Sequence, residues 1–191
     1  LKVGAGCDNS NDMGPLISEA HYQTVANFIE SGVSQEADLV CDGRGLSVEG
    51  YENGYFLGAT LFDHVKPHMD IYQKEIFGPV LVMLRVPDMQ SAVNLINEHE
   101  YGNGTCLFTR DGEAARYFTD NIKVGMVGVN VPLPVPVAYH SFGGWKRSGF
   151  GDIDQYGQEG LRFWTKTKKV PQRWPDGGGD GSNAFVIPTM G

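Results

Sequence analysis

The stretch Glu75-Ile76-Phe77-Gly78-Pro79-Val80 sets a carboxylate two residues before an aromatic ring, where a loop enters an apolar run. Gly78 and Pro79 favour a turn at this point. The run that follows, residues 80–86, is apolar at every position except Arg85. Continuity of this kind is typical of a strand that is buried on both faces of a parallel sheet. We therefore expect an α/β fold with such a strand after the turn.

Helical and extended patterns alternate on both sides of this stretch. Ser18 is suited to cap a helix that runs to about residue 31, because apolar residues recur there at three- and four-residue spacing. Asp88 begins a second helix. The remaining expectations are short apolar segments at 37–41 and 55–62, strands at 105–109, 126–130 and 161–170, and a helix at 113–121. The alternation predicts a mostly parallel sheet.

Composition limits the class of protein. With 191 residues, 41% of them hydrophobic, the chain can bury one sizeable core. A net charge of -8, with no long run among the 15 Lys and Arg residues, argues against a nucleic-acid partner. No apolar run approaches the roughly 20 residues that span a bilayer, so we expect no membrane partner. We expect a cytoplasmic protein, or one of the mitochondrial matrix if the source is eukaryotic.

The ends of the chain suggest a fragment with a flexible tail. The sequence opens at Leu1 without an initiator Met, which we interpret as the loss of an amino-terminal part. Residues 176–182 are rich in glycine, and we expect flexibility over 172–191.

Neither the cysteines nor the histidines predict a metal or catalytic site. Cys7, Cys41 and Cys106 are odd in number and far apart, with no redox or metal-ligand spacing, which favours a reducing compartment. We expect Cys106 to lie in the core. His64 and His68 have helical spacing for two metal ligands, but Pro67 lies between them, so we assign no metal.

Glu75 and Phe77 have side chains that are suited to binding a nucleotide. A carboxylate can accept two hydrogen bonds from the vicinal hydroxyls of a ribose, and charge-assisted bonds of this type are the stronger ones. An aromatic ring two residues later can pack on the ribose or on a nicotinamide ring. A lone glutamate before a strand is more often a solvated loop residue, so spacing alone leaves both interpretations open.

A second aromatic residue lies on a glycine-rich turn in His140-Ser141-Phe142-Gly143-Gly144-Trp145-Lys146-Arg147-Ser148-Gly149. This stretch has neither the Gly-Lys-Ser/Thr ending of a phosphate loop nor the spacing of a dinucleotide fingerprint. Before it, three prolines in residues 131–137 exclude a helix and a central strand. We expect an ordered loop that lines a site.

Together these stretches resemble the aldehyde dehydrogenase superfamily, from residues 11–17 to residues 166–168, which is the carboxy-terminal part of such an enzyme. The proline series and Asp152 make the chain most similar to the coenzyme A-acylating methylmalonate-semialdehyde dehydrogenases. The resemblance implies a three-layer α/β/α catalytic domain over 1–153. It also implies an oligomerisation segment at 154–171 whose strand joins another chain in a dimer or tetramer.

The resemblance implies an enzyme that oxidises methylmalonate or malonate semialdehyde with NAD and releases propionyl- or acetyl-coenzyme A. Glu75 and Phe77 would hold the nicotinamide half of NAD. Phe142 would form part of the wall of the aldehyde tunnel, and Pro134 and Pro136 would stiffen that wall. The alternative is that Phe142 packs in the core behind the turn. The family's thiol nucleophile lies upstream of the region resembled, so we assign no catalytic residue here and expect the isolated chain to be inactive.

Two other functions stay open. Many hydrolytic NAD(P)-dependent aldehyde dehydrogenases carry Arg where Asp152 stands and lack the proline series, so only these features favour the acylating branch. A non-catalytic module that keeps the fold for association is the second alternative. The sequence does not distinguish among short semialdehydes.

Overall fold

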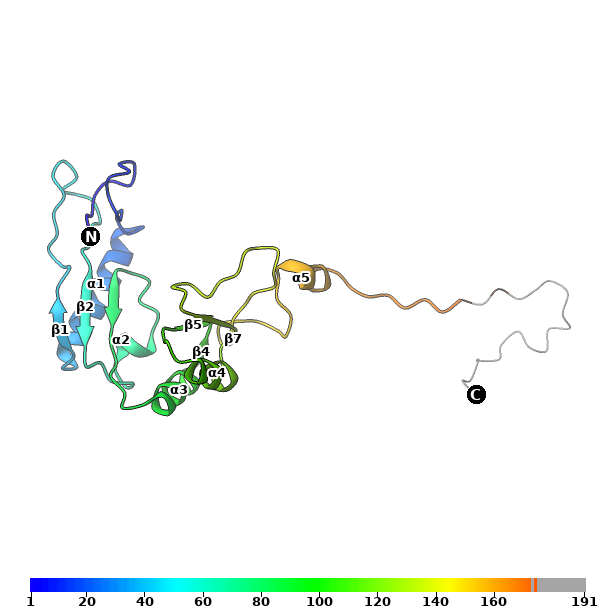
Figure 1. Cartoon of the computed structure of the whole chain (residues 1–191). Coiled ribbons are helices and arrows are strands. Elements are labelled where there is room, and N and C mark those ends of the chain that lie inside the picture. Colours follow the sequence, from blue (N-terminus) through cyan, green and yellow to red (C-terminus); the bar gives the residue numbers. More distant parts are fainter. Residues whose placement is uncertain (173, 175–191) are drawn as a thin grey trace, which may run out of the picture.

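Helix α1 (Glu19–Ser34) and a three-stranded sheet form the first group of elements in the computed structural model, which describes residues 1–172 and 174 (Figure 1). The strand order is β1 (Asp38–Cys41), β2 (Thr60–Asp63), β3 (Val80–Val82). β1 runs antiparallel to β2, and β2 runs parallel to β3. The short helix α2 (Asp70–Gln73) lies in the connection from β2 to β3.

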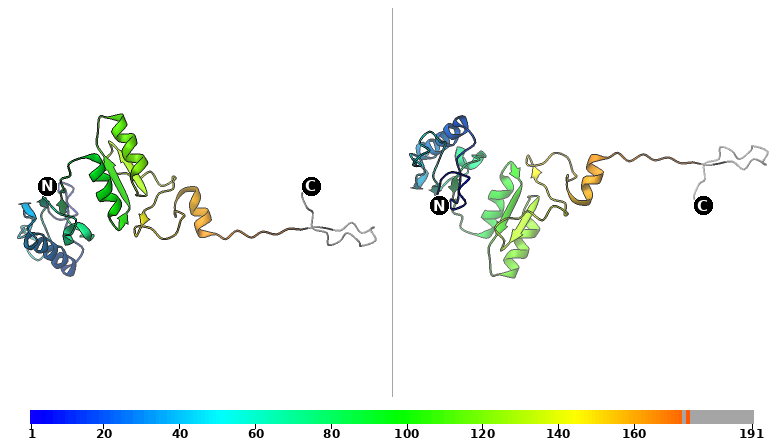
Figure 2. Two further views of the ribbon diagram at one scale, coloured as in Figure 1. Left: turned by 90° about the horizontal axis from the view of Figure 1, so that it is seen from below. Right: turned by 90° about the horizontal axis from the view of Figure 1, so that it is seen from above.

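A second group of elements follows, and the two views of Figure 2 show it beside the first. Its elements are α3 (Met89–Glu98), β4 (Tyr101–Gly102), β5 (Gly104–Leu107), α4 (Gly112–Asn121), β6 (Met126–Val129) and β7 (Trp145–Lys146). β5 pairs with β6 in parallel, and β4 pairs with β7 antiparallel. Helix α5 (Gly157–Trp164) and an extended segment complete the described chain.

The three predicted helices are confirmed, because each begins where the sequence provides a capping side chain. Ser18 accepts a hydrogen bond from the backbone N–H of His21 at 3.2 Å, and α1 ends at Ser34, a little beyond the predicted end. Asp88 caps α3 and Asp111 caps α4 in the same way. Such caps satisfy donors that the first turn of a helix leaves free.

Most of the buried apolar side chains in the described part of the chain form two clusters, where composition had led us to expect one core. The first lies between α1 and the sheet and includes Ile29 and Phe62, both fully buried. A Cβ on Gly32 of α1 would lie 2.8 Å from the Phe62 ring, so the helix approaches the sheet closely. The second cluster lies under α3 and α4 and includes Val93 and Phe118.

Two predicted strands differ from the structure. The strand expected over 80–86 to be buried on both faces is limited to Val80–Val82, and Leu81 within it is 63% exposed. β3 is an edge strand, and only one of its faces packs on the first cluster. The strand expected over 161–170 begins instead as helix α5, and residues 165–170 have no regular structure. The expected flexible tail lies almost entirely outside the described residues.

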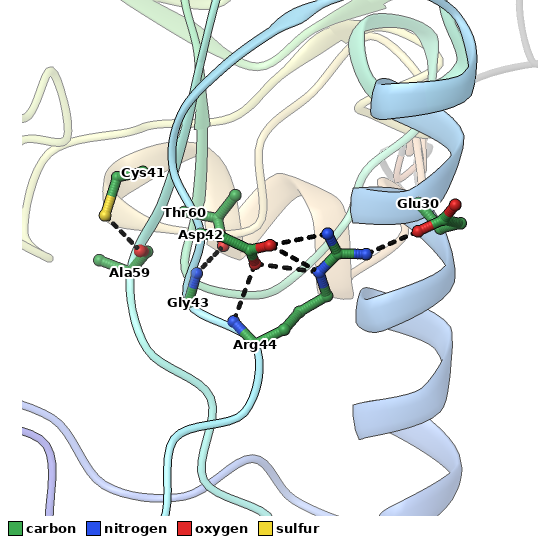
Figure 3. A network of polar contacts seen from close by, with 7 residues as sticks. All are labelled: Glu30, Cys41, Asp42, Gly43, Arg44, Ala59 and Thr60. Atoms are coloured by element: carbon green, nitrogen blue, oxygen red, sulfur yellow. Dashed lines mark hydrogen bonds and ion pairs between the residues drawn. The ribbon is translucent and has the colours of Figure 1, made fainter.

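Arg44 ties the loop after β1 to helix α1 (Figure 3). Its guanidinium contacts Asp42 and Glu30, each at 2.7 Å, and lowers the pKa of Asp42. Beside it, Gly43 and Gly58 approach so closely that a Cβ on Gly43 would lie 2.0 Å from the Gly58 carbonyl oxygen. This loop therefore depends on glycine at position 43.

Within residues 1–172, none of the helices combines the length and the apolar character that a bilayer crossing demands.

Candidate functional site

The loop between α2 and β3 presents Phe77 to the outside. Phe77 adopts a left-handed backbone conformation, with φ of 55°, and its side chain is 79% exposed. Its carbonyl oxygen accepts a hydrogen bond from His21 Nε2 at 2.7 Å, and the two rings meet edge to face. A Cβ on Gly78 would lie 2.8 Å from Val25 of α1, and Ile76 is buried in the first cluster. The backbone is therefore held on both sides while most of the aromatic ring stays exposed to solvent.

Glu75 lies on the wall of a pocket of about 480 Å³. Its other lining residues are Tyr72, Lys74, His99, Tyr101, Asn103, Arg147 and Ser148. Lys74 is paired with Asp70, and Arg147 with Glu100. Within the described part of the chain, Glu75 has no ion-pair partner. Its carboxylate is therefore free to accept hydrogen bonds from a ligand.

His99 connects the segment that leads to Glu75 with strand β4. Its Nδ1 accepts a hydrogen bond from the backbone N–H of Tyr101 at 3.1 Å. Nε2 must then carry the proton, and it donates to the Tyr72 carbonyl oxygen at 3.2 Å. The ring also meets Tyr72 edge to face, with centroids 5.0 Å apart. This arrangement requires the neutral form of His99 with the proton on Nε2.

Lys146 fixes the glycine-rich turn to the end of helix α3. Its backbone is left-handed, with φ of 55°. Its Nζ donates hydrogen bonds to the carbonyl oxygens of Ile96, Asn97 and His99 at 3.1, 3.0 and 3.0 Å. These are acceptors that the last turn of a helix leaves free. Burial, and to a lesser extent the charge of Lys123, lowers the pKa of Lys146.

The next two residues of the turn reach the pocket of Glu75. Ser148 Oγ accepts a hydrogen bond from the backbone N–H of Gly102 at 3.1 Å. The Arg147 guanidinium lies 5.4 Å from the centre of the Tyr101 ring and pairs with Glu100. The structure thus brings Glu75 of the first stretch and Arg147 and Ser148 of the second onto the wall of one pocket.

Phe142 lies on the wall of a second pocket of about 320 Å³. Its ring stacks on Tyr156, with centroids 4.4 Å apart and an angle of 9° between the planes. Asn103 and Ser148 line both this pocket and that of Glu75, so the two adjoin. Phe142 is half-buried and lines this pocket.

Three predicted site residues lie outside these pocket walls. Pro134 packs on the β5–β6 pair, where its Cγ lies 2.8 Å from a Cβ placed on Gly104. Pro134 and Pro136 flank Val135, which does line the pocket of Phe142. Phe77 lines neither pocket. The prolines can therefore stiffen the wall only through Val135.

No pattern in the sequence pointed to His99 or Tyr156, because their contacts with Tyr72 and Phe142 join residues distant along the chain. Lys146 belongs to the glycine-rich turn that the sequence indicated. Its acceptors at the end of α3 lie 47 to 50 positions earlier, so sequence spacing could not predict them. In residues 1–172, no three His, Cys, Asp or Glu side chains are placed to share a metal ion.

Residues 1–170 match the sequence model described as "Aldehyde dehydrogenase family". With that match and the fold described above, the chain belongs to the aldehyde dehydrogenase family. It is 60% identical, over 190 residues, to malonate-semialdehyde dehydrogenase of Pseudomonas aeruginosa. It is 44% identical, over 192 residues, to the acylating mitochondrial methylmalonate-semialdehyde/malonate-semialdehyde dehydrogenase of Bos taurus. Both alignments cover 100% of this chain, but 38% and 36% of the relatives.

A solved structure from Sinorhizobium meliloti 1021 gives the same result. It is described as a methylmalonate-semialdehyde dehydrogenase complexed with NAD, and it is 53% identical with a TM-score of 0.89. The match covers 93% of this chain and 36% of that one. The predicted aldehyde dehydrogenase fold and the resemblance to the methylmalonate-semialdehyde branch are confirmed. The chain spans a little over a third of the length of its relatives.

Proposed function

We propose that this chain is the carboxy-terminal part of an NAD-dependent, coenzyme A-acylating dehydrogenase of malonate or methylmalonate semialdehyde. The observation that carries the proposal is the pocket in which Glu75 meets Arg147 and Ser148 of the glycine-rich turn. The names of the bacterial and bovine relatives support the substrate class. The products would be acetyl- or propionyl-coenzyme A, with loss of carbon dioxide.

The residues on the pocket wall fit the ribose of NAD. Glu75 is exposed and unpaired in the described chain, so it can accept hydrogen bonds from both ribose hydroxyls without first breaking an ion pair. The exposed ring of Phe77, whose backbone is held by His21, can pack on the sugar or on the nicotinamide. NAD, when bound, supplies a ring that accepts hydride from the aldehyde carbon.

The second pocket fits the aldehyde end of the reaction. Phe142, Val135 and Ile153 give it an apolar wall, which would exclude water from the reacting carbon. It adjoins the pocket of Glu75 through Asn103 and Ser148. Adjacent pockets are what hydride transfer between an aldehyde and a nicotinamide needs, because the two reactants must meet.

The cysteines of the described chain do not supply the thiol nucleophile in this proposal. Cys106 is half-buried, with its Sγ 3.0 Å from a Cβ placed on Gly128 of β6, and it lines neither pocket. Cys7 and Cys41 are exposed and also lie outside both pockets. We therefore propose that these 191 residues alone do not turn over a semialdehyde, because covalent catalysis requires a thiol beside the aldehyde.

We also propose a homo-oligomer, a dimer or tetramer, in the intact enzyme. The described chain supports association through its exposed apolar end, where Leu161 and Trp164 of α5 are 74% and 72% exposed. The bovine relative is named as mitochondrial, so we propose a matrix location if the source is eukaryotic.

The natural polypeptide, purified from its source organism, should form NADH from malonate semialdehyde in the presence of coenzyme A. Without coenzyme A, we expect at most a slow reaction after the first turnover, because the acyl group then stays on the enzyme. Acetyl-coenzyme A should accumulate with the NADH. NADH formed at the same rate with water alone would favour the hydrolytic function. No NADH from any aldehyde would favour the association module.

Substitution Glu75→Gln tests the cofactor site. Loss of the carboxylate charge should raise KM for NAD roughly tenfold, since hydrogen bonds to a charged group contribute about 1.5–3 kcal/mol. Glu49→Gln is a matched control, because Glu49 is also exposed and lines neither pocket. Equal KM values for the two variants would exclude Glu75 from the NAD site.

A further inference from the structure

The chain folds back on the glycine-rich turn after residue 151, and this return segment holds the residue that stacks on Phe142. Ser141 Oγ donates a hydrogen bond to the Tyr156 carbonyl oxygen at 3.0 Å. The Phe142 and Tyr156 rings lie nearly parallel, 4.4 Å apart. Ser141 thus binds the backbone of Tyr156, and the Phe142 ring stacks on the Tyr156 side chain.

Gly143 and Gly157 allow residues 140–143 and residues 154–157 to approach closely. Gly157 has φ of 63°, and a Cβ there would lie 2.6 Å from the Ser141 backbone nitrogen and 2.7 Å from the His140 carbonyl carbon. A side chain at 157 would therefore be strained and would also push the segments apart. On the other side of Phe142, a Cβ on Gly143 would lie 2.0 Å from a carboxylate oxygen of Asp154. Residues 154–157 thus clasp residues 140–143.

We propose that Tyr156 is a positioning residue that fixes the Phe142 ring and so sets the width of the aldehyde pocket. The inference rests on the proposed function for the identity of the ligand, a short aldehyde. Tyr156 and Phe142 both line the pocket of about 320 Å³, and Tyr156 is the stacked neighbour of Phe142 in the described chain. Without the Tyr156 ring, Phe142 can tilt into the space it leaves, and the pocket widens.

A wider pocket should affect aldehydes according to their length. A short semialdehyde depends on the wall for its orientation, so its kcat/KM should fall about tenfold in Tyr156→Ala. A longer apolar aldehyde, hexanal, gains room and should keep or raise its kcat/KM. Tyr156→Phe retains the stacked ring and should restore the ratio of kcat/KM for the two aldehydes that Tyr156→Ala changes.

The matched control is Tyr51→Ala. Tyr51 and Tyr156 are 52% and 49% exposed, and each contacts one phenylalanine ring. Tyr51 lies in the loop between β1 and β2 and lines neither pocket. We expect Tyr51→Ala to leave the ratio of kcat/KM for malonate semialdehyde and hexanal unchanged. Equal losses for both aldehydes in Tyr156→Ala, or the same shift in Tyr51→Ala, would overturn the positioning role.

Amide hydrogen exchange tests the clasp without reference to activity. In the polypeptide as its source produces it, Tyr156→Ala should speed exchange over residues 139–143, while Tyr51→Ala should not. Gly157→Ala should give the same faster exchange with the Tyr156 side chain still present. Unchanged exchange in both variants would refute the inference even if the enzyme is active. Faster exchange without any aldehyde oxidation by the unchanged protein would support the clasp and refute the proposed function.

Discussion

Replacing Lys146 by Met should loosen the glycine-rich turn from helix α3. The ammonium group donates three hydrogen bonds to the carbonyl oxygens of Ile96, Asn97 and His99, and methionine keeps an unbranched side chain, one atom shorter, without a donor. The three carbonyls lose their shared partner. The left-handed backbone of Lys146 loses the contact that holds its side chain in place.

The expected loss of stability is about 1.5 kcal/mol. A cation at a helix carboxyl end contributes about 0.3–1 kcal/mol. Hydrogen bonds from a charged donor contribute about 1.5–3 kcal/mol when well shielded, but this side chain lies at the surface and is only partly desolvated, so water can replace part of each bond. For a chain of this length, the loss corresponds to a fall in melting temperature of about 5 °C.

Urea unfolding of the 191-residue chain, followed by circular dichroism, measures the change. Lys123→Met is the matched control, because Lys123 is the neighbouring lysine whose charge lowers the pKa of Lys146. Removing that charge should leave stability unchanged or raise it. Equal unfolding midpoints for Lys146→Met and the unchanged chain would refute the reasoning.

Three further changes have expected outcomes. The Arg85 guanidinium lowers the pKa of Asp63 from 3.8 to about 2, so this carboxylate contributes stability above pH 3.8 that is lost as pH falls toward 2. Acid titration of Asp63→Asn should lack that part of the loss. Gly43→Ala should cost about 3 kcal/mol in urea unfolding, because its Cβ would overlap the Gly58 carbonyl oxygen. Gly112→Ala, which meets no atom within 4 Å, should instead gain about 0.5 kcal/mol; equal midpoints for the two variants would contradict this contrast.

Local signals in the sequence predicted helices α1, α3 and α4. Ser18 and Asp88 cap helices through bonds to residues three positions later, so both partners lie within one short window. The strand over 161–170 was wrong because helix α5 continues to Trp164, although Leu161, Arg162 and Phe163 alternate in polarity as a strand would. Short segments of this kind fit both patterns.

Burial and long-range contacts could not be predicted from the sequence. The run after Pro79 is apolar enough for a two-sided strand, but its position at the sheet edge leaves Leu81 exposed. The motif made Glu75 a candidate site residue, whereas the residues that support its pocket could not be predicted. His99 hydrogen-bonds to the carbonyl oxygen of Tyr72, which lies 27 positions earlier, and no rule of sequence spacing links these two residues.

A crystal structure of the polypeptide as its source produces it, with NAD bound, would test the proposed cofactor site most directly. We predict that the Glu75 carboxylate accepts hydrogen bonds from the hydroxyls of the nicotinamide ribose, with the Phe77 ring packed beside that half of NAD. A structure in which Glu75 still faces solvent, while the nicotinamide ribose binds elsewhere, would contradict the assignment.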